Sequence, residues 1–366
     1  MMKLFDERWG TWCLAYLVVI LIAGLWPFDP FPRNEVTWLQ DRNGLRFGPA
    51  GIVMSSENFQ WPAAEQKSDC SLELYLEPYT NLGSNSILTF YTPEAPQGLR
   101  IFEWRRTILL IYRDIGSLHR EIDVEHAFRS GTPILITITS GSRGTLVYLN
   151  GKLAEASHGL SLSLSDLSGQ MILGTSPVTD ANWAGEMRGV AIYKRQLAPD
   201  EIVRHFIAWT TAANPGTSQT EGAAALYAFR ERSGRVVRDD LSSAPDLEIP
   251  RSFQVPHKVL LLAPWKDFEW TPSYFQDVVI NVAGFVPFGF LLCAYFNSKR
   301  SLGWAVTTSL GLGFLTSLTI EVLQVWLPTR FSSSTDVINN TIGTGLGVLL
   351  FSLAGFRKQK ERGSAT

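Results

Sequence analysis

The sequence predicts a membrane protein with four transmembrane helices and an all-β sandwich inserted between the first and the second. Four uncharged apolar runs cover residues 11–28, 278–296, 301–320 and 337–356. Each is close to the ~20 residues that a helix needs to cross ~30 Å of hydrocarbon. Between the first two runs, short apolar stretches alternate with polar residues and are bounded by turn residues, a pattern that is typical of an all-β domain.

The composition is that of a folded chain with more than one domain. Of 366 residues, 45% are hydrophobic and 18% are charged, which is unlike a disordered chain, and the length favours two or three domains. The net charge of -2 argues against nucleic acid as a partner, because nucleic-acid-binding proteins usually carry a strong basic bias. No His or Cys spacing resembles a zinc site, so we predict no metal.

The first apolar run is predicted to remain in the protein as a helix within residues 1–28. A cleaved signal peptide is the alternative, but a cleavage site has a small-x-small pattern. Trp26-Pro27-Phe28 stands in that place instead. Trp26 is expected at the membrane interface, where tryptophan is enriched.

Residues 29–207 are predicted to form the sandwich. Asn150-Gly151 is a strong signal for a tight hairpin turn, and a helix is expected over 198–206, with Pro199 in its first turn. The expected strands include 71–76, 87–91, 107–112, 134–139 and 145–149. Residues 208–270 are predicted to hold a linker, 208–222, and then two or three strands that either complete the sandwich or pack beneath it.

One polar motif, D-x3-N-x2-G, begins both the second and the fourth apolar run. It occurs as Asp277, Asn281 and Gly284 and again as Asp336, Asn340 and Gly343. Residues i and i+4 share a helical face, so the Asp and the Asn of each copy point the same way. Between the copies, Glu321 and Gln324 end the third run and Arg330 follows. Such groups in membrane helices usually mark a site or a buried pairing.

Basic residues predict the orientation in the membrane. Cytoplasmic loops are enriched in Lys and Arg. With both termini in the cytoplasm, the cytoplasmic basic residues are Lys3, Arg8, Lys299, Arg300 and those of the tail, 357–366. The sandwich and the polar residues above are then expected on the extracytoplasmic side.

Two stretches of the β region resemble laminin-G-like, concanavalin A-like jelly rolls. Val147-Tyr-Leu-Asn-Gly151 is similar to their "Y-x-N-G" hairpin, and residues 183–197 are similar to their closing strand and the approach to a short helix. The resemblance implies a two-sheet jelly roll of a kind that often binds carbohydrate. Some relatives also hold calcium, so calcium in the sandwich stays open; no other cofactor is expected.

The membrane segment, 271–356, resembles the VanZ-like membrane family. The residues that carry this resemblance are Trp26-Pro27-Phe28, Asp277, Asn281, Phe285, Pro287, Gly289, Glu321, Gln324, Pro328, Arg330, Asp336, Asn340, Gly343 and Gly347. Ser333 stands where that family commonly has another acidic or polar residue. The resemblance implies a multi-pass protein of the bacterial cytoplasmic (inner) membrane, associated with the cell envelope and glycopeptide-antibiotic tolerance, and it implies no particular reaction.

A third pattern, Glu121-Ile-Asp123-Val-Glu125, resembles the catalytic strand of family-16 glycoside hydrolases. Alternation in a strand puts the three carboxylates on one face, and retaining hydrolysis uses a nucleophile and an acid of this kind. The alternative is a solvated outer strand face.

Three hypotheses of function follow, and whether the protein is an enzyme stays open. It is a non-enzymatic envelope protein that binds a glycan or glycolipid, with membrane lipid as its surroundings; or a membrane enzyme acting on a lipid-linked sugar; or a scaffold for proteins of a polysaccharide-export machine. In the enzyme, Glu321 would be the base, Asp277 or Asp336 its partner or a metal ligand, and Arg330 a phosphate clamp.

We expect the polar residues of the membrane segment to converge into one outward-facing pocket, because none can face lipid cheaply. The candidate binding residues of this pocket are Asn281, Gln324, Arg330 and Asn340, beside the acidic candidates Glu321, Asp277 and Asp336. We also expect Arg330 to lie within reach of at least one carboxylate.

Overall fold

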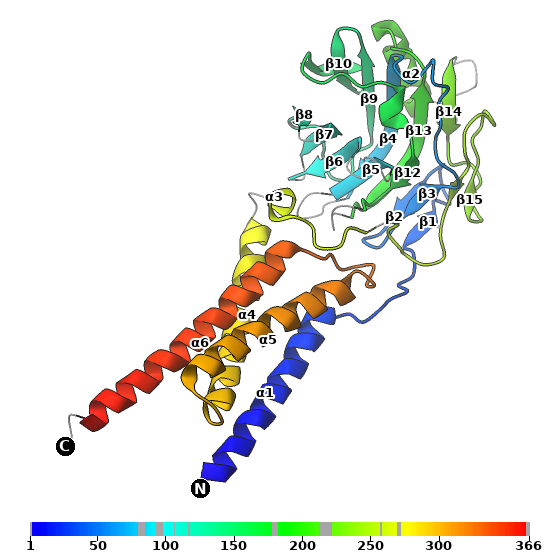
Figure 1. Cartoon of the computed structure of the whole chain (residues 1–366). Helices are drawn as coiled ribbons and strands as arrows, with labels where there is room; N and C mark the ends of the chain where they lie inside the picture. The colour runs from blue at the N-terminus through cyan, green and yellow to red at the C-terminus, as the bar shows by residue number, and fades with distance from the viewer. Residues whose placement is uncertain are drawn as a thin grey trace. The chain divides into compact units, whose positions relative to one another are not determined.

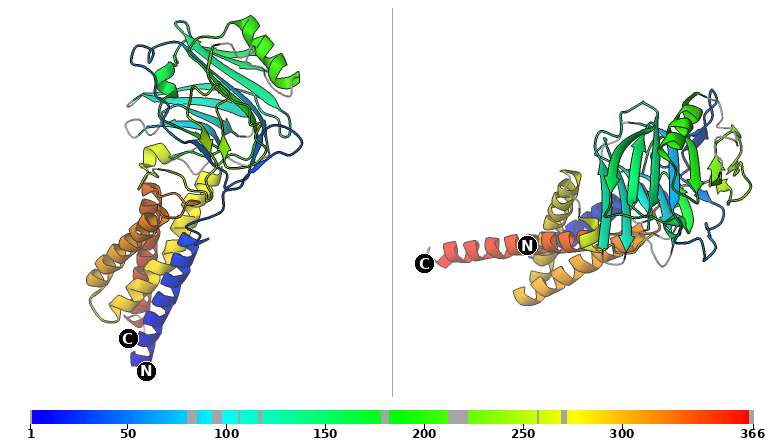
Figure 2. Two further views of the ribbon diagram at one scale, coloured as in Figure 1. Left: turned by 90° about the vertical axis from the view of Figure 1, so that its right-hand side faces the viewer. Right: turned by 90° about the horizontal axis from the view of Figure 1, so that it is seen from above.

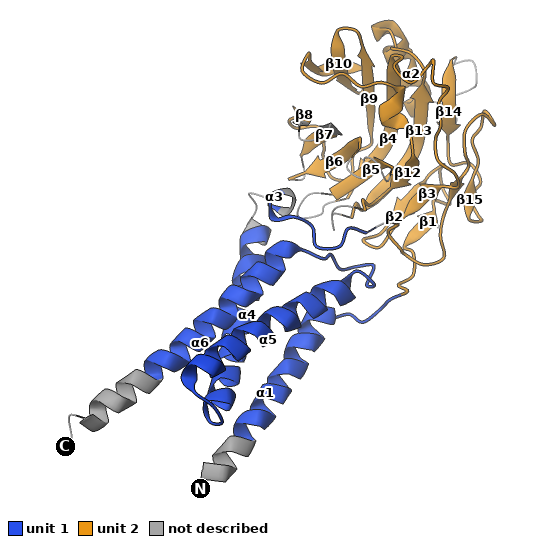
Figure 3. Ribbon diagram, in the orientation of Figure 1, with its two compact units in different colours: residues 1–30, 258–366 blue, residues 31–257 orange. Residues whose placement is uncertain are grey.

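The protein has two compact units, one helical and one built of β-strands (Figure 3). The computed structural model describes residues 2–79, 85–92, 98–105, 107–115, 118–177, 182–211, 222–256, 258–268 and 272–363. The helical unit consists of residues 1–30 and 258–366, and the β unit consists of residues 31–257. The β unit is therefore inserted after the first helix, and the predicted fold class is confirmed.

Four helices of the helical unit are long and apolar enough to span a membrane. The unit contains α1 (Met2–Leu25), the short α3 (Pro264–Asp267), α4 (Pro272–Asn297), α5 (Leu302–Gln324) and α6 (Ser334–Gly363) (Figure 1). The apolar spans are Arg8–Leu25, Tyr274–Asn297, Leu302–Gln324 and Ser334–Ala354. Helix α6 continues as a helix into the basic segment that follows its apolar part.

The helical unit has an apolar core of its own and a broad apolar exterior. Its largest cluster of buried side chains joins α1, α4 and α5 through Cys13, Ile20, Phe285, Phe288, Leu292 and Ile320. Large apolar side chains such as Leu14, Val279 and Leu315 remain exposed around it. A soluble bundle would bury such residues, whereas a bundle in a bilayer turns them towards lipid.

Helices α4 and α6 pack in parallel at very close range through glycines. A Cβ on Gly343 would lie 2.2 Å from the backbone oxygen of Val282, and one on Gly347 would lie 2.0 Å from that of Val286. The spacing of four residues on both helices shows that they run in the same direction. Small residues at such positions let membrane helices approach closely.

The first sheet of the β unit has eight strands among the described residues, in the order β1-β2-β13-β4-β9-β10-β11, with β14 also paired to β13. Their bounds are β1 Val36–Trp38, β2 Leu45–Phe47, β13 Gly185–Tyr193, β4 Cys70–Pro78, β9 Ile134–Gly141, β10 Gly144–Leu149, β11 Lys152–Ser157 and β14 Ala223–Tyr227. All its strand pairs are antiparallel.

The second sheet also has eight strands in the described part of the chain, in the order β15-β16-β3-β12-β5-β6-β7-β8. They are β15 Val236–Val237, β16 Leu247–Glu248, β3 Val53–Ser55, β12 Gln170–Leu173, β5 Asn85–Tyr91, β6 Arg100–Trp104, β7 Ile108–Ile115 and β8 Leu118–Val124. A short 3₁₀ helix, Leu164–Leu167, precedes β12.

The main core lies between the two sheets, and a second cluster lies on the outer face of the first sheet. Phe47, Phe90 and Trp183 are among the fully buried side chains of the main core. On the outer face, helix α2 (Pro199–Thr211) covers Tyr193 and Leu226 with Ile202 and Trp209. Figure 2 shows this helix against the strands from two further directions.

The hairpin signal was correct, and the later β segment completes both sheets. Asn150 and Gly151 both have positive φ, 51° and 78°, and connect β10 to β11, as a two-residue hairpin turn requires. Strand β14 pairs with β13 of the first sheet, whereas β16 pairs with β3 of the second. Most of the predicted linker, residues 212–221, lies outside the described residues.

Candidate functional site

The loop between α5 and α6 is fixed by the segment that precedes α3. The Leu262 amide donates to the Ser332 carbonyl at 2.9 Å, and the Ser334 amide donates to the Leu262 carbonyl at 3.0 Å. The Nζ of Lys258 donates to the carbonyls of Leu327, Pro328 and Arg330 at 2.6, 2.8 and 2.5 Å. A single ammonium group thus satisfies three loop carbonyls, and this holds the start of α6 beside the end of α5.

Glu321 lies in the last turn of α5 with only 1% of its surface exposed. Its Oε2 accepts the backbone N–H of Ser333 at 2.7 Å, just before α6 begins. The positive end of a helix favours an anion there. Glu321 is also close enough to Asp336 and Arg330 to interact with both electrostatically.

The two copies of the D-x3-N-x2-G motif contact one another through one hydrogen bond, and the Asn of each copy has a different partner. Asn281 of the first copy donates to Oδ1 of Asp336 in the second at 2.6 Å. Asn340 donates to the hydroxyl of Ser317 on α5 at 2.9 Å, one turn deeper in the bundle. Asp336 lies in the first turn of α6, whereas Asp277 lies in the second turn of α4 and is exposed.

Arg330 and Gln324 bind the end of α1. Arg330 Nη2 donates to the carbonyls of Ala23 and Gly24 at 3.1 and 3.3 Å, and Gln324 Nε2 donates to Gly24 at 2.8 Å. Basic side chains commonly satisfy the last carbonyls of a helix in this way. Within the described residues Arg330 forms no ion pair, because the end of α1 accepts its guanidinium donors. Arg330 still lies close enough to the Glu321 carboxylate to interact with it electrostatically.

We call Asn281, Ser317, Glu321, Gln324, Arg330, Ser333, Asp336 and Asn340 the interhelical polar cluster. Several buried atoms in and beside it have no hydrogen-bond partner among the described residues. They are Gln324 Oε1, Arg330 Nε, Thr335 Oγ1, Asn339 Nδ2 and Asn340 Oδ1. Leaving such an atom unpaired costs about 1–3 kcal/mol. The cluster therefore has spare donors and acceptors with which to bind a polar group.

Sequence reasoning missed Lys258, Ser317 and the role of Ser333 in this cluster. Lys258 is an isolated basic residue in a short apolar segment, and Ser317 is one of many small residues in α5. Neither has a neighbour in sequence that marks it. The described residues contain no group of three or more His, Cys, Asp or Glu that could hold a metal ion.

The glycosidase-like motif begins on β8 of the β unit. Ile122 and Val124 point into the core, so Glu121 and Asp123 are exposed on the outer face of the second sheet. Strand β8 ends at Val124, so Glu125 lies in the turn that follows and does not continue the strand face. The motif thus supplies two carboxylates on the strand and not the three that alternation predicted.

The β unit also has a buried carboxylate between its sheets. Glu103 is 2% exposed, and its Oε2 accepts the indole N–H of Trp183 at 3.1 Å. Burial raises the pKa of Glu103 to about 7, although the hydrogen bond from Trp183 acts against this shift. The folded protein therefore binds this proton more tightly than the unfolded chain, in which the pKa is near 4.5.

Glu103→Gln is expected to stabilise the β unit at pH 8 and not at pH 4. Since the folded state holds the extra proton, the contribution of Glu103 to the unfolding free energy is highest below about pH 4.5 and falls as the pH rises to about 7. The difference at pH 8 should be on the order of 2 kcal/mol in favour of the glutamine variant. Thermal melts of both proteins from pH 4 to 8 measure it, and parallel curves would contradict the assignment.

This fold defines a class of protein: a multi-pass membrane protein with an inserted β-sandwich and a polar cluster among its helices. Residues 224–355 match the model of the VanZ/LLP1 family, and residues 59–203 match that of the concanavalin A-like lectin/glucanases superfamily. The chain thus contains a VanZ-like membrane domain and a concanavalin A-like domain. Protein VanZ of Enterococcus faecium is 35% identical over 88 residues, which are 24% of this chain and 52% of that protein. The match therefore spans about half of the relative's length.

Solved structures of other proteins are similar to part of this chain. A Bacteroides ovatus protein provisionally described as carbohydrate-binding has 14% identity and a TM-score of 0.42, with 59% of this chain and 61% of that chain covered. The CBM40 domain of a Ruminococcus gnavus sialidase, bound to sialyllactose, has 11% identity and a TM-score of 0.35, with 45% and 97% covered. At these identities the likeness concerns the fold alone.

Proposed function

We propose that this protein is an envelope protein of the bacterial cytoplasmic membrane that binds a glycan or a glycolipid on the extracytoplasmic side. The observation that carries the proposal is the interhelical polar cluster, in which buried donors and acceptors are left unused at the end of the bundle where α4 and α6 begin. A sugar headgroup presents hydroxyls that can both donate to and accept from such atoms. The match of residues 59–203 to lectins and glucanases supports a sugar as the ligand.

Chain connectivity and charge support the orientation that this proposal requires. The β unit is joined to the end of α1 and the start of α4. The opposite ends of the helices carry Lys299, Arg300 and the basic residues of the tail. The positive-inside rule favours a cytoplasmic location for those ends. The proposed site and the β unit then share the extracytoplasmic side, where envelope polysaccharides are handled and where glycopeptide antibiotics act.

The test is binding by the purified full chain in nanodiscs, with lipid-linked saccharides and an array of envelope glycans as probes. Glu321→Gln and Asn340→Leu should each weaken the binding of a lipid-linked saccharide by about tenfold or more, because each removes groups worth ~1–3 kcal/mol. Thr319→Val is the matched control, because Thr319 is exposed on the same helix as Glu321 and its hydroxyl donates to the Leu315 carbonyl one turn earlier.

The same experiment separates the competing functions. If no probe binds, or if Glu321→Gln and Thr319→Val behave alike, the proposal is wrong. Turnover of a lipid-linked saccharide by the wild type, lost in Glu321→Gln, would instead identify an enzyme with Glu321 as its base. Stable partner proteins with tolerance of every polar variant would identify a scaffold.

A further inference from the structure

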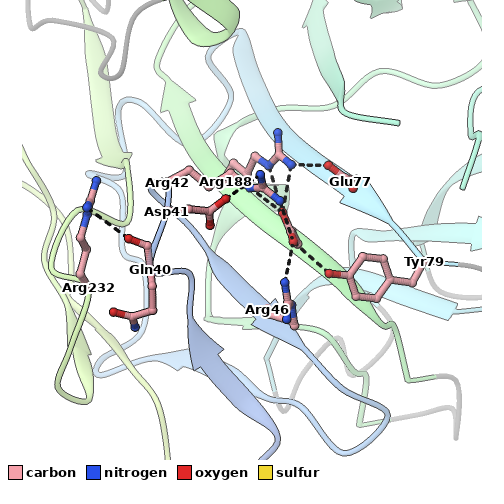
Figure 4. Close-up of polar contacts among 9 residues, drawn as sticks. Gln40, Asp41, Arg42, Arg46, Glu77, Tyr79, Arg188 and Arg232 are labelled. Atoms are coloured by element: carbon pink, nitrogen blue, oxygen red, sulfur yellow. Dashed lines mark hydrogen bonds and ion pairs between the residues drawn. The ribbon is translucent and has the colours of Figure 1, made fainter. Parts of the chain in front are cut away.

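Three arginines gather on the outer face of the first sheet, in a region that the polar cluster does not include. They are Arg42, Arg46 and Arg188, and with Glu77, Tyr79 and Glu186 they form what we call the arginine patch (Figure 4). Strands β2, β13 and β4 lie side by side here. Leu45, Met187 and Leu76 on these strands point into the core. Their neighbours Arg46, Glu186 and Glu77 therefore point to the outer face.

Glu186 organises the patch. Its carboxylate is 2% exposed and accepts Arg42 Nε at 3.1 Å, Arg188 Nη2 at 2.9 Å, Arg46 Nη2 at 3.3 Å and the Tyr79 hydroxyl at 2.9 Å. Burial acts to raise the pKa of Glu186, but the hydrogen bonds from Arg42, Arg188, Tyr79 and Arg46 outweigh it and lower the pKa to about 2. The carboxylate is thus ionised at every pH of interest and holds the guanidinium groups in fixed positions.

The arginines differ in how much of each remains available. Arg188 is 11% exposed and also pairs with Glu77, so it is used within the protein. Arg42 is 43% exposed and also binds Asp41 at the edge of the patch. Arg46 is 53% exposed, and the bond to Glu186 uses only one of its nitrogens. A guanidinium has five N–H donors, so Arg46 has further donors for a ligand while its bond to Glu186 fixes the position of the side chain.

The guanidinium groups of Arg46 and Arg42 lie at the accessible surface of the patch, whereas two of its three carboxylates are mostly buried. Three guanidinium groups face the carboxylates of Glu77 and Glu186, which lie beneath them with 14% and 2% exposure, and the carboxylate of Asp41 balances the third positive charge from the edge of the patch. Asp41 is 69% exposed and largely hydrated. An incoming group therefore meets the donors of Arg46 first, because a planar guanidinium can bind a carboxylate in a bidentate manner. Each nitrogen of Arg42 already donates to Glu186 or Asp41, so Arg42 adds its charge beside the site.

We propose that the arginine patch is a binding site for the carboxylate of an acidic sugar in an envelope glycan, with Arg46 as the main contact and Arg42 beside it. Glu186 is a positioning residue that never touches the ligand. The site lies in the β unit and is distinct from the interhelical polar cluster. The inference rests on the proposed function in so far as the ligand is a glycan, and it adds the charge of that glycan and its place on the protein.

The experiment measures the binding of galacturonate oligosaccharides to the full chain in nanodiscs by calorimetry. The methyl ester of the same oligosaccharide is the matched neutral probe, and inorganic phosphate is the competitor that tests for a general anion site. The acid is expected to bind about tenfold more tightly than its ester, and Arg46→Gln should remove that preference. Arg46→Lys should keep part of it, because a lysine retains the charge and loses the fork.

Arg232→Gln is the control for the loss of one surface charge. Arg232 is an exposed arginine of the same unit, and in Figure 4 its guanidinium binds the Gln40 carbonyl and not a carboxylate of the patch. This variant should bind the acid within about twofold of the wild type, since an exposed charge that does not touch the ligand is largely screened. Equal melting temperatures for the variants exclude unfolding as the cause of a loss of binding. Arg46 is half-exposed, so its replacement should disturb the fold little.

The outcomes separate this inference from the proposed function. Equal affinity for acid and ester, or equal losses in Arg46→Gln and Arg232→Gln, would overturn the arginine site even if neutral glycans bind. Full competition by millimolar phosphate would show a general anion site and overturn the assignment to a sugar carboxylate. If the acidic oligosaccharide binds Glu321→Gln as it binds the wild type, but not Arg46→Gln, the arginine patch is supported. The role of the polar cluster is decided separately, by the binding of lipid-linked saccharides.

Discussion

Replacing Glu73 by leucine is expected to lower the unfolding free energy of the β unit by about 3–5 kcal/mol, because it leaves several buried donors unpaired. Glu73 on β4 is fully buried. Its Oε2 accepts the Tyr193 hydroxyl and the Trp209 indole N–H, each at 3.0 Å, and its Oε1 lies 3.0 Å from His205 Nδ1. Trp209 and His205 belong to α2, so the substitution should also release this helix from the sheet.

The measurement is hydrogen exchange and thermal unfolding of the full chain in detergent. The amides of α2 should lose protection first, and the melting temperature of the β unit should fall. Glu155→Leu is the matched control, since Glu155 is exposed on the edge strand β11, and its effect should stay within about 0.5 kcal/mol. The loss of stability in Glu73→Gln should lie between those of Glu73→Leu and Glu155→Leu, because the glutamine keeps one acceptor oxygen and replaces the other with an N–H donor. Unchanged exchange of the α2 amides in Glu73→Leu would contradict this account.

The elements themselves were predictable because each has a local signature. Apolar runs of about the right length predicted α1, α4, α5 and α6, and the pair Asn150-Gly151 predicted the turn that the structure contains. Alternation also gave the correct face for Glu121 and Asp123. In each case the information lies within a window of a few residues to about twenty, which is the range of hydrophobic periodicity and turn chemistry.

The partners of the polar residues were not predictable, because alternation gives the face of a strand but not its neighbour. Arg46, Tyr79 and Glu186 meet only because β13 lies between β2 and β4. In the bundle, the repeated D-x3-N-x2-G motif indicated a shared site, and Asn281 does bind Asp336. It gave no sign that Arg330 would bind the end of α1, since no local pattern links residues some 300 positions apart.

Adding one methyl group at Gly347 is expected to disrupt the bundle, whereas the same change at Gly345 is not. A Cβ at Gly347 would lie 2.0 Å from the Val286 oxygen and 2.6 Å from the Phe290 nitrogen. Both atoms belong to the backbone of α4, which cannot move away as a flexible side chain could. Helices α4 and α6 must then separate, at a cost of about 1–3 kcal/mol or more for an overpacked contact.

The control at Gly345 tests the close approach and not glycine itself. There the nearest atom to an added Cβ is Leu310 Cδ2 at 3.7 Å, an ordinary contact, and an alanine in a helix is favoured over glycine by up to about 1 kcal/mol. In thermal unfolding of the full chain in detergent, Gly345→Ala should therefore match or exceed the wild type, and Gly347→Ala should melt well below it. The double variant Gly343→Ala/Gly347→Ala should lose about 3 kcal/mol or more, since Gly343 lies equally close to Val282. If Gly345→Ala and Gly347→Ala melt together, α4 and α6 are not held at this distance, and the parallel glycine contact that brings Asn281 to Asp336 is wrong.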